Sequence, residues 1–165
     1  MNILILSDSH GYYDEKILRY CSESDEIWHA GDIGTVECAQ KMTADRVFRA
    51  VHGNIDGQAL RSMYPEYQYF EIGTVKILIL HIAFQGKKMN DNCEKLYHKY
   101  MPDVLVYGHS HIAKIWRPKS FEGLLAINPG AIGKHGFHQH RTCCRLTISD
   151  NKLSALEMIE FGTRG

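Results

Sequence analysis

Apolar segments that end in metal-binding residue types recur along this chain of 165 residues. Segment 104–107 is followed directly by His109 and His111. An uninterrupted apolar run of this length is typical of a strand that is buried on both faces. Because residues i and i+2 of an extended segment project to the same side, both imidazoles are expected to point to one place just beyond the strand.

Four other apolar segments end in the same way. After segments 3–6, 27–30, 47–51 and 77–80, the residues that can bind a metal are, in chain order, Asp8 with His10, Asp32, Asn54 and His81. In α/β proteins, ligands bind in the crevice outside the carboxyl ends of the strands. These strand ends therefore bring a whole set of candidate ligands to one edge of the predicted sheet.

The seven candidate ligands are too many for one metal ion and suit two. A mixture of carboxylate and imidazole favours manganese, iron, zinc or nickel over magnesium, which prefers oxygen ligands. Asp8 and Asp32 would cancel part of the charge of two divalent cations. The positive charge that remains can hold a bridging hydroxide and an anionic phosphate. Two ions about 3.5–4 Å apart can clamp the attacking and leaving oxygens of phosphoryl transfer. Taken singly, His29 and His52 are interpreted as hydrogen-bonded core histidines rather than as ligands.

The order of the predicted elements defines an α/β fold. Strands at 3–6, 26–30 and 47–51 alternate with helices at 14–21, 35–42 and 58–63, which indicates a sheet whose first strands are parallel. The second half is richer in strands and is expected to be antiparallel, with predicted strands at 67–72, 75–80, 104–107, 112–117, 123–127, 143–148 and 152–158 and a helix at 90–100. Together the elements predict two packed sheets with helices outside, in one domain that spans residues 1–165.

Charge and cysteine content exclude several classes of function. Lys and Arg together number 19, as do Asp and Glu, so the balance offers no basic surface for bulk nucleic-acid binding or for an anionic membrane. The apolar run at the N-terminus is too short for a signal peptide or a membrane span. The five cysteines show no paired spacing, which favours reduced thiols and a cytoplasmic protein.

Five motifs taken together resemble the calcineurin-like metallophosphoesterase superfamily. They are Asp8-Ser9-His10, Gly31-Asp32, Gly53-Asn54-Ile55-Asp56, His81 and Gly108-His109-Ser110-His111. The small size of the chain and the segment Asn128-Pro129-Gly130 further resemble the small YfcE-type phosphodiesterase branch. The resemblance extends over about residues 3–148 and implies a four-layer αββα sandwich.

The resemblance also implies a role for each ligand. Asp8, His10 and His111 would hold a first ion, Asn54, His81 and His109 a second, and Asp32 would bridge the two. Manganese is the expected metal of this pair of divalent ions, with nickel, iron and zinc as alternatives. The implied reaction is hydrolysis of a small phosphodiester by in-line attack of a hydroxide held by the two ions, with Asp32, Asn54 and His109 as catalytic residues.

The chain departs from the family pattern where a general acid would be expected. Larger members have a histidine at the position of Ile55, and Ile82 and Ala83 stand where the family has glycine and sometimes a second histidine. We therefore expect the loop 134–141 to assist the reaction. The phosphate or leaving group would be bound by His135 or Arg141, together with Asn54. A solvated polar loop is the alternative interpretation. Segment 85–90 is similarly expected to be either a loop on the substrate side or merely solvated.

Other functions stay open on the same motifs. A phosphomonoesterase or a nuclease could use the same ions, although a nuclease acting on long polymers would be expected to carry a basic face. A catalytically silent interaction scaffold is an alternative from another class, for which a retromer subunit that resembles this family is the precedent. No membrane partner is expected, and a homodimer is left open.

Overall fold

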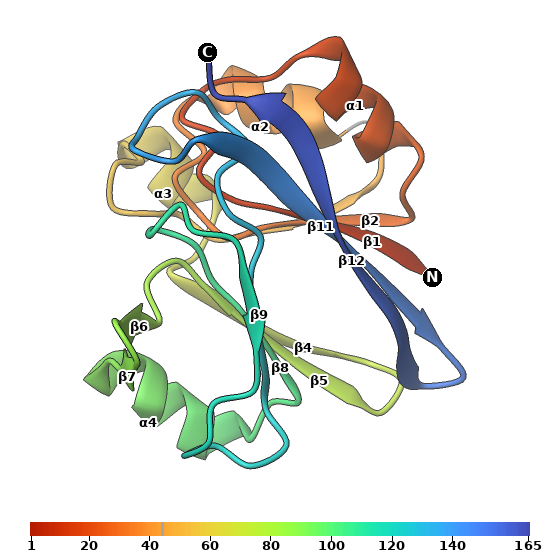
Figure 1. Cartoon of the computed structure of the whole chain (residues 1–165), viewed down its shortest axis with the longest axis vertical. Helices are drawn as coiled ribbons and strands as arrows, with labels where there is room; N and C mark the ends of the chain where they lie inside the picture. Colours follow the sequence, from red (N-terminus) through yellow and green to blue (C-terminus); the bar gives the residue numbers. More distant parts are fainter. Residues whose placement is uncertain (44) are drawn as a thin grey trace.

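A computed structural model describes residues 1–43 and 45–165, and its main elements are two five-stranded sheets (Figure 1). The first sheet has the order β12-β11-β1-β2-β3 and comprises β1 (Asn2–Leu6), β2 (Glu26–His29), β3 (Val47–Ala50), β11 (His140–Ser149) and β12 (Lys152–Thr163). The second has the order β4-β5-β8-β10-β9 and comprises β4 (Tyr67–Ile72), β5 (Val75–Leu80), β8 (Val104–Val106), β9 (Lys114–Trp116) and β10 (Leu125–Asn128). A separate hairpin consists of β6 (Phe84–Gln85) and β7 (Lys88–Met89).

Four helices cover the outer faces of the two sheets among the described residues. They are α1 (Glu15–Ser22), α2 (Val36–Thr43), α3 (Gln58–Met63) and α4 (Asp91–Tyr100). The polar residues Asp14, Thr35 and Asn90 precede helices, and each side chain accepts a hydrogen bond from a backbone N–H of the first turn. These caps satisfy N–H groups that a helix start leaves without partners.

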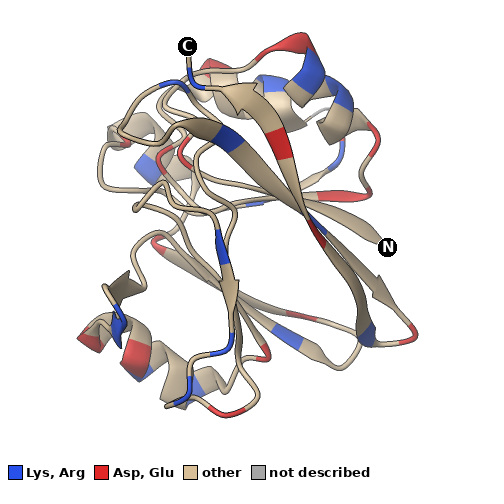
Figure 2. Ribbon diagram, viewed as in Figure 1, with Lys and Arg blue, Asp and Glu red and all other residues tan. Residues whose placement is uncertain are grey.

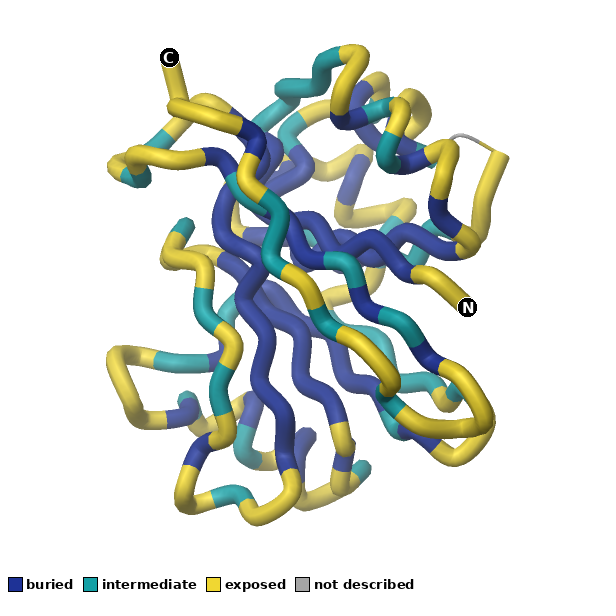
Figure 3. Tube along the Cα trace, turned by 45° about the vertical axis from the view of Figure 1, so that its right-hand side comes forward, coloured by how far each residue is buried: buried dark blue, intermediate teal, exposed yellow. Residues whose placement is uncertain are grey.

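The apolar runs form three core layers because their residues alternate between faces. In β1, Ile3 and Ile5 pack between the two sheets, whereas Leu4 and Leu6 pack against the helices of the first sheet. The second sheet divides in the same way, with one face of β5 and β8 toward the first sheet and the other toward α4. Figure 3 shows these strands as the buried centre of the molecule. The αββα sandwich expected from the resemblance is therefore confirmed.

The prediction of an antiparallel second half is wrong in part. β8 pairs parallel with both β5 and β10, whereas β4, β9 and the β6–β7 and β11–β12 pairs are antiparallel to neighbours in the described part of the chain. α4 accounts for the first of these pairings, because a helical connection carries the chain back across the sheet and sets β8 parallel to β5. The predicted hairpin at Gly73-Thr74 is confirmed, since Ile72 pairs with Val75.

Basic and acidic residues are both scattered along the helices and strands (Figure 2). The described part of the chain contains no helix that is both long enough and apolar enough to cross a membrane.

Candidate metal centre

The candidate ligands come together where β1, β2, β3, β5 and β8 end. Two groups of His, Asp or Glu side chains lie there with their ligand atoms within 4.8 Å of one another. The first cluster consists of Asp8, His10 and His111, and the second of Asp32, His81 and His109. His109 and His111, which their spacing predicted to point to one place, thus lie in different clusters, as in the division that the family resemblance implies.

The first cluster is built around the buried carboxylate of Asp8. The Nε2 atom of His111 lies 3.3 Å from Asp8 Oδ1 and 3.3 Å from Nε2 of His10. Asp8 also accepts hydrogen bonds from the hydroxyl of Ser7 and from the backbone N–H of His109. These two donors fix the carboxylate in position while leaving it close to both imidazoles.

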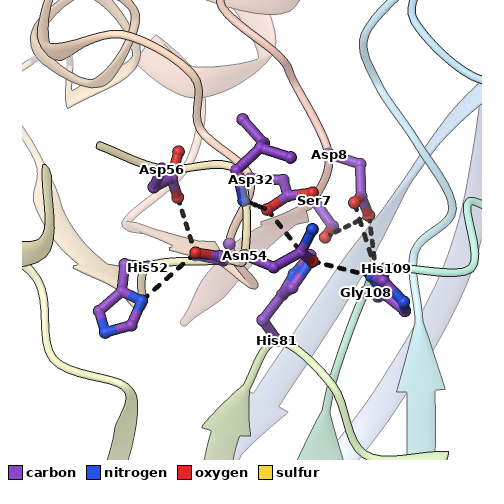
Figure 4. Close-up of polar contacts among 12 residues, drawn as sticks. Ser7, Asp8, Asp32, His52, Asn54, Asp56, His81, Gly108 and His109 are labelled. Atoms are coloured by element: carbon purple, nitrogen blue, oxygen red, sulfur yellow. Dashed lines mark hydrogen bonds and ion pairs between the residues drawn. The ribbon is translucent and has the colours of Figure 1, made fainter.

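The second cluster gathers around the side-chain oxygen of Asn54 (Figure 4). Asn54 Oδ1 lies 3.0 Å from His81 Nε2 and 2.9 Å from His109 Nδ1. His81 Nε2 is also 3.2 Å from Asp32 Oδ1. Asn54 is therefore a fourth oxygen or nitrogen ligand candidate in this cluster.

Asp32 lies between the two clusters. Its Oδ1 faces His81, and its Oδ2 lies 3.8 Å from His10 Nε2. The backbone N–H of Ile55 donates to Oδ1 and holds the carboxylate. Burial acts to raise the pKa of Asp32, but the hydrogen bond and charge of His81 outweigh it, so the pKa is lowered and the group is an anion. One carboxylate thus presents an oxygen to each cluster.

The chemistry of these side chains fits divalent cations. His81 Nδ1 donates to the carbonyl of Ala30 at 2.7 Å, which leaves Nε2 to face two oxygens, from Asp32 and Asn54. Nε2 can interact favourably with two acceptor oxygens if it carries the second proton of the ring or if a cation lies between them. Burial alone lowers the pKa of His81, but the hydrogen bond to Asp32 and the nearby carboxylates raise it above its ordinary value. The position of Nε2 between Asp32 and Asn54 thus suits a divalent cation.

Burial also keeps other ligand imidazoles in the form that binds metals. It is the main cause of the lowered pKa values of His10 and His109. Neutral imidazoles carry the lone pair that a metal ion needs.

Five candidate ligands have a left-handed backbone. Their φ angles are 54° for Asp8, 48° for His10, 55° for Asp32, 70° for His109 and 59° for His111. Non-glycine residues rarely adopt this region, and such strain concentrates at functional sites. The tight turns after the strands place the side chains, rather than the backbone, toward the centre.

Glycines allow the loops to approach one another closely. A Cβ atom on Gly31, whose φ is +92°, would lie 2.7 Å from His81 Nδ1. A Cβ atom on Gly53 would collide with the carboxylate of Asp32. The glycines of the Gly-Asp and Gly-Asn motifs are thus required by the space that the ligands occupy.

Asp56, the last residue of its motif, supports the site without joining either cluster. This buried carboxylate accepts hydrogen bonds from the backbone N–H groups of Ile33, Gly34 and Gly53. It therefore ties the loop after β2 to the loop after β3. The motif contained Asp56, but sequence reasoning assigned it no role.

Two further side chains hold the ligand loops. Arg61 donates to the carbonyls of Gly53, Asn54 and Asp56. Asn128 donates to the carbonyl of Gly108 and to the hydroxyl of Ser110. The Asn-Pro-Gly segment was a sequence signal for Asn128, whereas nothing in the sequence singled out Arg61.

His29 is a hydrogen-bonded core histidine, as interpreted from the sequence. Its Nε2 lies 2.9 Å from Ser9 Oγ, and the backbone N–H of Gly31 donates to its Nδ1. Burial lowers the pKa of His29 from 6.5 to about 4. The unfolded chain therefore binds the proton more tightly than the folded protein between these two pH values.

We expect His29 to make the protein less stable in acid. Its contribution is fully present above pH 6.5 and is lost as the pH falls toward 4, amounting to roughly 3 kcal/mol. Urea unfolding at several pH values should therefore show a shallower loss of stability for His29→Gln than for the unchanged protein. If the unfolding free energy fell equally steeply with pH in the two proteins, the lowered pKa of His29 would be contradicted.

The two residues of loop 134–141 that were predicted to bind substrate have different surroundings. The ring of His135 lies 4.9 Å from that of His10, measured between centroids, so this predicted substrate-binding residue lies beside the first cluster. Arg141 instead donates to the carboxylate of Asp14 and to the carbonyls of Phe161 and Thr163. The guanidinium of Arg141 is thus occupied in anchoring β12, which argues against its expected contact with phosphate.

We expect Arg141→Met to lower stability rather than substrate affinity. Loss of one partner of this largely buried pair with Asp14 should cost about 3 kcal/mol in unfolding free energy, while KM changes by less than about twofold. Arg145→Met is the matched control, since this half-buried residue of β11 pairs with the exposed Glu157 at 3.8 Å, and its loss should cost less than about 1 kcal/mol. A large rise in KM, measured on the folded fraction of Arg141→Met, would instead support binding of phosphate by Arg141.

Comparisons with known proteins agree with this fold and show the family. The calcineurin-like phosphoesterase superfamily domain matches residues 1–151. A probable metallophosphoesterase of Mycoplasma pneumoniae is 29% identical over 164 residues, with 93% of this chain and 94% of that protein covered. The probable metallophosphoesterase YsnB of Bacillus subtilis is 33% identical, with coverage of 80% and 75%.

Two solved structures share the arrangement of the strands. A predicted phosphoesterase from Streptococcus pneumoniae has a TM-score of 0.71 at 26% identity, with 99% of this chain and 89% of that chain covered. Vps29 from Entamoeba histolytica has a TM-score of 0.74 at 16% identity, with 98% and 100% covered, which shows the fold alone.

A sandwich of two sheets with paired ligand clusters at the strand ends is the architecture of a metallophosphoesterase. The chain belongs to the calcineurin-like phosphoesterase superfamily. Its relatives support a hydrolase of phosphate esters, and the family implies divalent metal ions.

Proposed function

We propose that the protein is a phosphodiesterase that uses two divalent ions, of which manganese is the expected metal. The observation that carries the proposal is the position of Asp32, with one carboxylate oxygen toward each cluster. A carboxylate so placed can bridge two ions. The ions, when bound, would supply a water of lowered pKa as the nucleophile and positive charge for the phosphate oxygens.

The side chains of this chain would prepare the reaction in three ways. Asp8, His10 and His111 would hold one ion, and Asn54, His81 and His109 the other, with Asp32 shared. Ser7 and the N–H of His109 keep Asp8 oriented, so little reorganisation is needed when an ion binds.

Substrate contacts would come from Asn54 and His135. Asn54 is exposed and its oxygen already lies in the second cluster, so its amide group borders the space for a phosphate. His135 stands exposed beside His10 on the other side. The exposed side chain at the general-acid position of larger members is Ile55, which cannot donate a proton, so activity should be highest on esters with good leaving groups.

The test is an assay on bis(4-nitrophenyl) phosphate with protein stripped by a chelator and then given manganese. We expect metal-dependent hydrolysis, and faster hydrolysis of this diester than of 4-nitrophenyl phosphate. Faster cleavage of the monoester would favour the phosphomonoesterase alternative. A protein that binds no metal and cleaves neither ester would favour the scaffold.

Single substitutions test the division of the ligands. His109→Ala and His111→Ala should each lower the metal content measured by elemental analysis from two ions per chain toward one, because each imidazole serves a different cluster. His98→Ala, an exposed histidine on α4, is the control and should leave the metal content unchanged. Retention of both ions in either ligand variant would contradict the division.

A further inference from the structure

A cavity of about 650 Å³ lies beside the second cluster. Asn54 and His81 form part of its wall, so the cavity opens onto the atoms that a metal ion would contact there. Its remaining walls come from α3 and the β3–α3 loop on one side and from the β6–β7 hairpin and the start of α4 on the other. A volume of this size is typical of small-molecule sites and is much larger than a methyl ester needs.

The β6–β7 hairpin is a fixed wall of this cavity. Phe84 packs with its ring centroid 5.1 Å from that of Tyr107 and 5.0 Å from that of Trp116, and Met89 is buried. Gln85 and Lys88 pair across the hairpin, and both line the cavity. Phe84 and Met89 hold the hairpin against the rest of the protein, while Gln85 and Lys88 are exposed and face the cavity.

The lining favours a polar but uncharged group. Two basic side chains, Arg61 and Lys88, are balanced by two acidic ones, Glu66 and Asp91, so the walls do not select a second phosphate. Apolar walls are also present, from Leu80, Ile82 and Met89. Amides of Gln85 and Asn92 can donate and accept hydrogen bonds.

We propose that this cavity binds one alcohol group of the phosphate ester, and that it takes a polar alcohol of sugar or nucleoside size. The inference rests on the proposed phosphodiesterase function, because the phosphate itself is to be held at the clusters. The apolar side chains of Leu80, Ile82 and Met89 suit the carbon skeleton of such a group, and the surrounding amides and charges suit its hydroxyl and ring heteroatoms. The hairpin β6–β7 is then the wall that determines specificity.

The test fills the cavity with a large side chain. Gln85→Trp should raise KM for thymidine 5′-(4-nitrophenyl) phosphate by about tenfold, while KM for methyl 4-nitrophenyl phosphate stays within about twofold. The two esters share a leaving group, so the difference reports on the retained alcohol. Lys87→Trp is the matched control, since Lys87 is exposed in the turn of the same hairpin and lies outside the cavity.

Binding without turnover separates this inference from the proposed function. In metal-free protein, thymidine should shift the backbone amide NMR signals of Gln85 and Lys88, and methanol should not. Gln85→Trp should abolish the shifts and Lys87→Trp should retain them. If the manganese-loaded protein cleaves neither ester but these shifts occur, the proposed function fails and the cavity stands. Equal effects of Gln85→Trp on both esters, or no shifts with thymidine, would overturn the cavity assignment.

Discussion

Replacing Asp32 by asparagine is expected to lower kcat on bis(4-nitrophenyl) phosphate by about a thousandfold or more, equivalent to about 4 kcal/mol in activation free energy. Asparagine keeps the shape of the side chain but loses the charge and one acceptor oxygen. Asp32 presents one oxygen to each cluster, so both proposed ion sites lose a ligand or its charge in this one substitution.

Two measurements make the Asp32 result specific. Metal content should fall below two ions per chain, whereas the unfolding free energy without metal should change little. Asp150→Asn is the matched control, because Asp150 also has a left-handed backbone, with φ of 50°, but lies exposed in the β11–β12 turn. An Asp32→Asn protein with both ions and near-normal kcat would refute the bridging role.

Replacing Asp56 by alanine is expected to destabilise the protein by about 3–5 kcal/mol in urea unfolding. The substitution leaves the buried N–H groups of Ile33, Gly34 and Gly53 without their acceptor. It also releases the two loops that carry Asp32 and Asn54, so metal affinity should fall although Asp56 contacts neither cluster.

An exposed aspartate provides the comparison for Asp56. Asp103 accepts one hydrogen bond, from the backbone N–H of Lys76, at the surface. Asp103→Ala should cost less than about 1 kcal/mol, because water can replace an exposed partner. Similar losses for the two variants would mean that the loop-tying role of Asp56 is incorrect.

Much of the fold and the gathering of the ligands at one edge could be predicted from local patterns, and their division into two groups came from the family resemblance. The apolar runs marked the buried strands because alternate residues pack on the two faces, as Ile3 and Leu4 do. The carboxyl ends of strands in an α/β fold share one edge, which was enough to expect all the candidate ligands there, whereas the placing of His81 and His109 at one ion came from the family resemblance. The parallel pairing of β8 was missed, although α4 between β5 and β8 was itself predicted.

Other features depend on contacts between distant parts of the chain. Arg141 is occupied by Asp14, 127 residues away, and nothing near Arg141 in the sequence indicates that partner. Strands as short as β6 and β7 carry too few residues to show an alternating pattern. The left-handed backbone of the ligand loops was likewise outside prediction, because Asp and His adopt it more often than most non-glycine residues but still in only a small minority of cases.

The clusters join the two sheets, and this has a consequence for how the molecule opens. Each cluster takes side chains from loops of both sheets, and contacts such as Asp8 to His109 and His10 to His111 span 101 residues. An ion bound in either cluster would act as a reversible cross-link between the halves of the sandwich, comparable to a disulfide in closing a long loop. Because only the folded arrangement presents the ligands together, metal availability would set the global stability by linkage. Loss of the ions should let the sheets separate first at the end that carries the site.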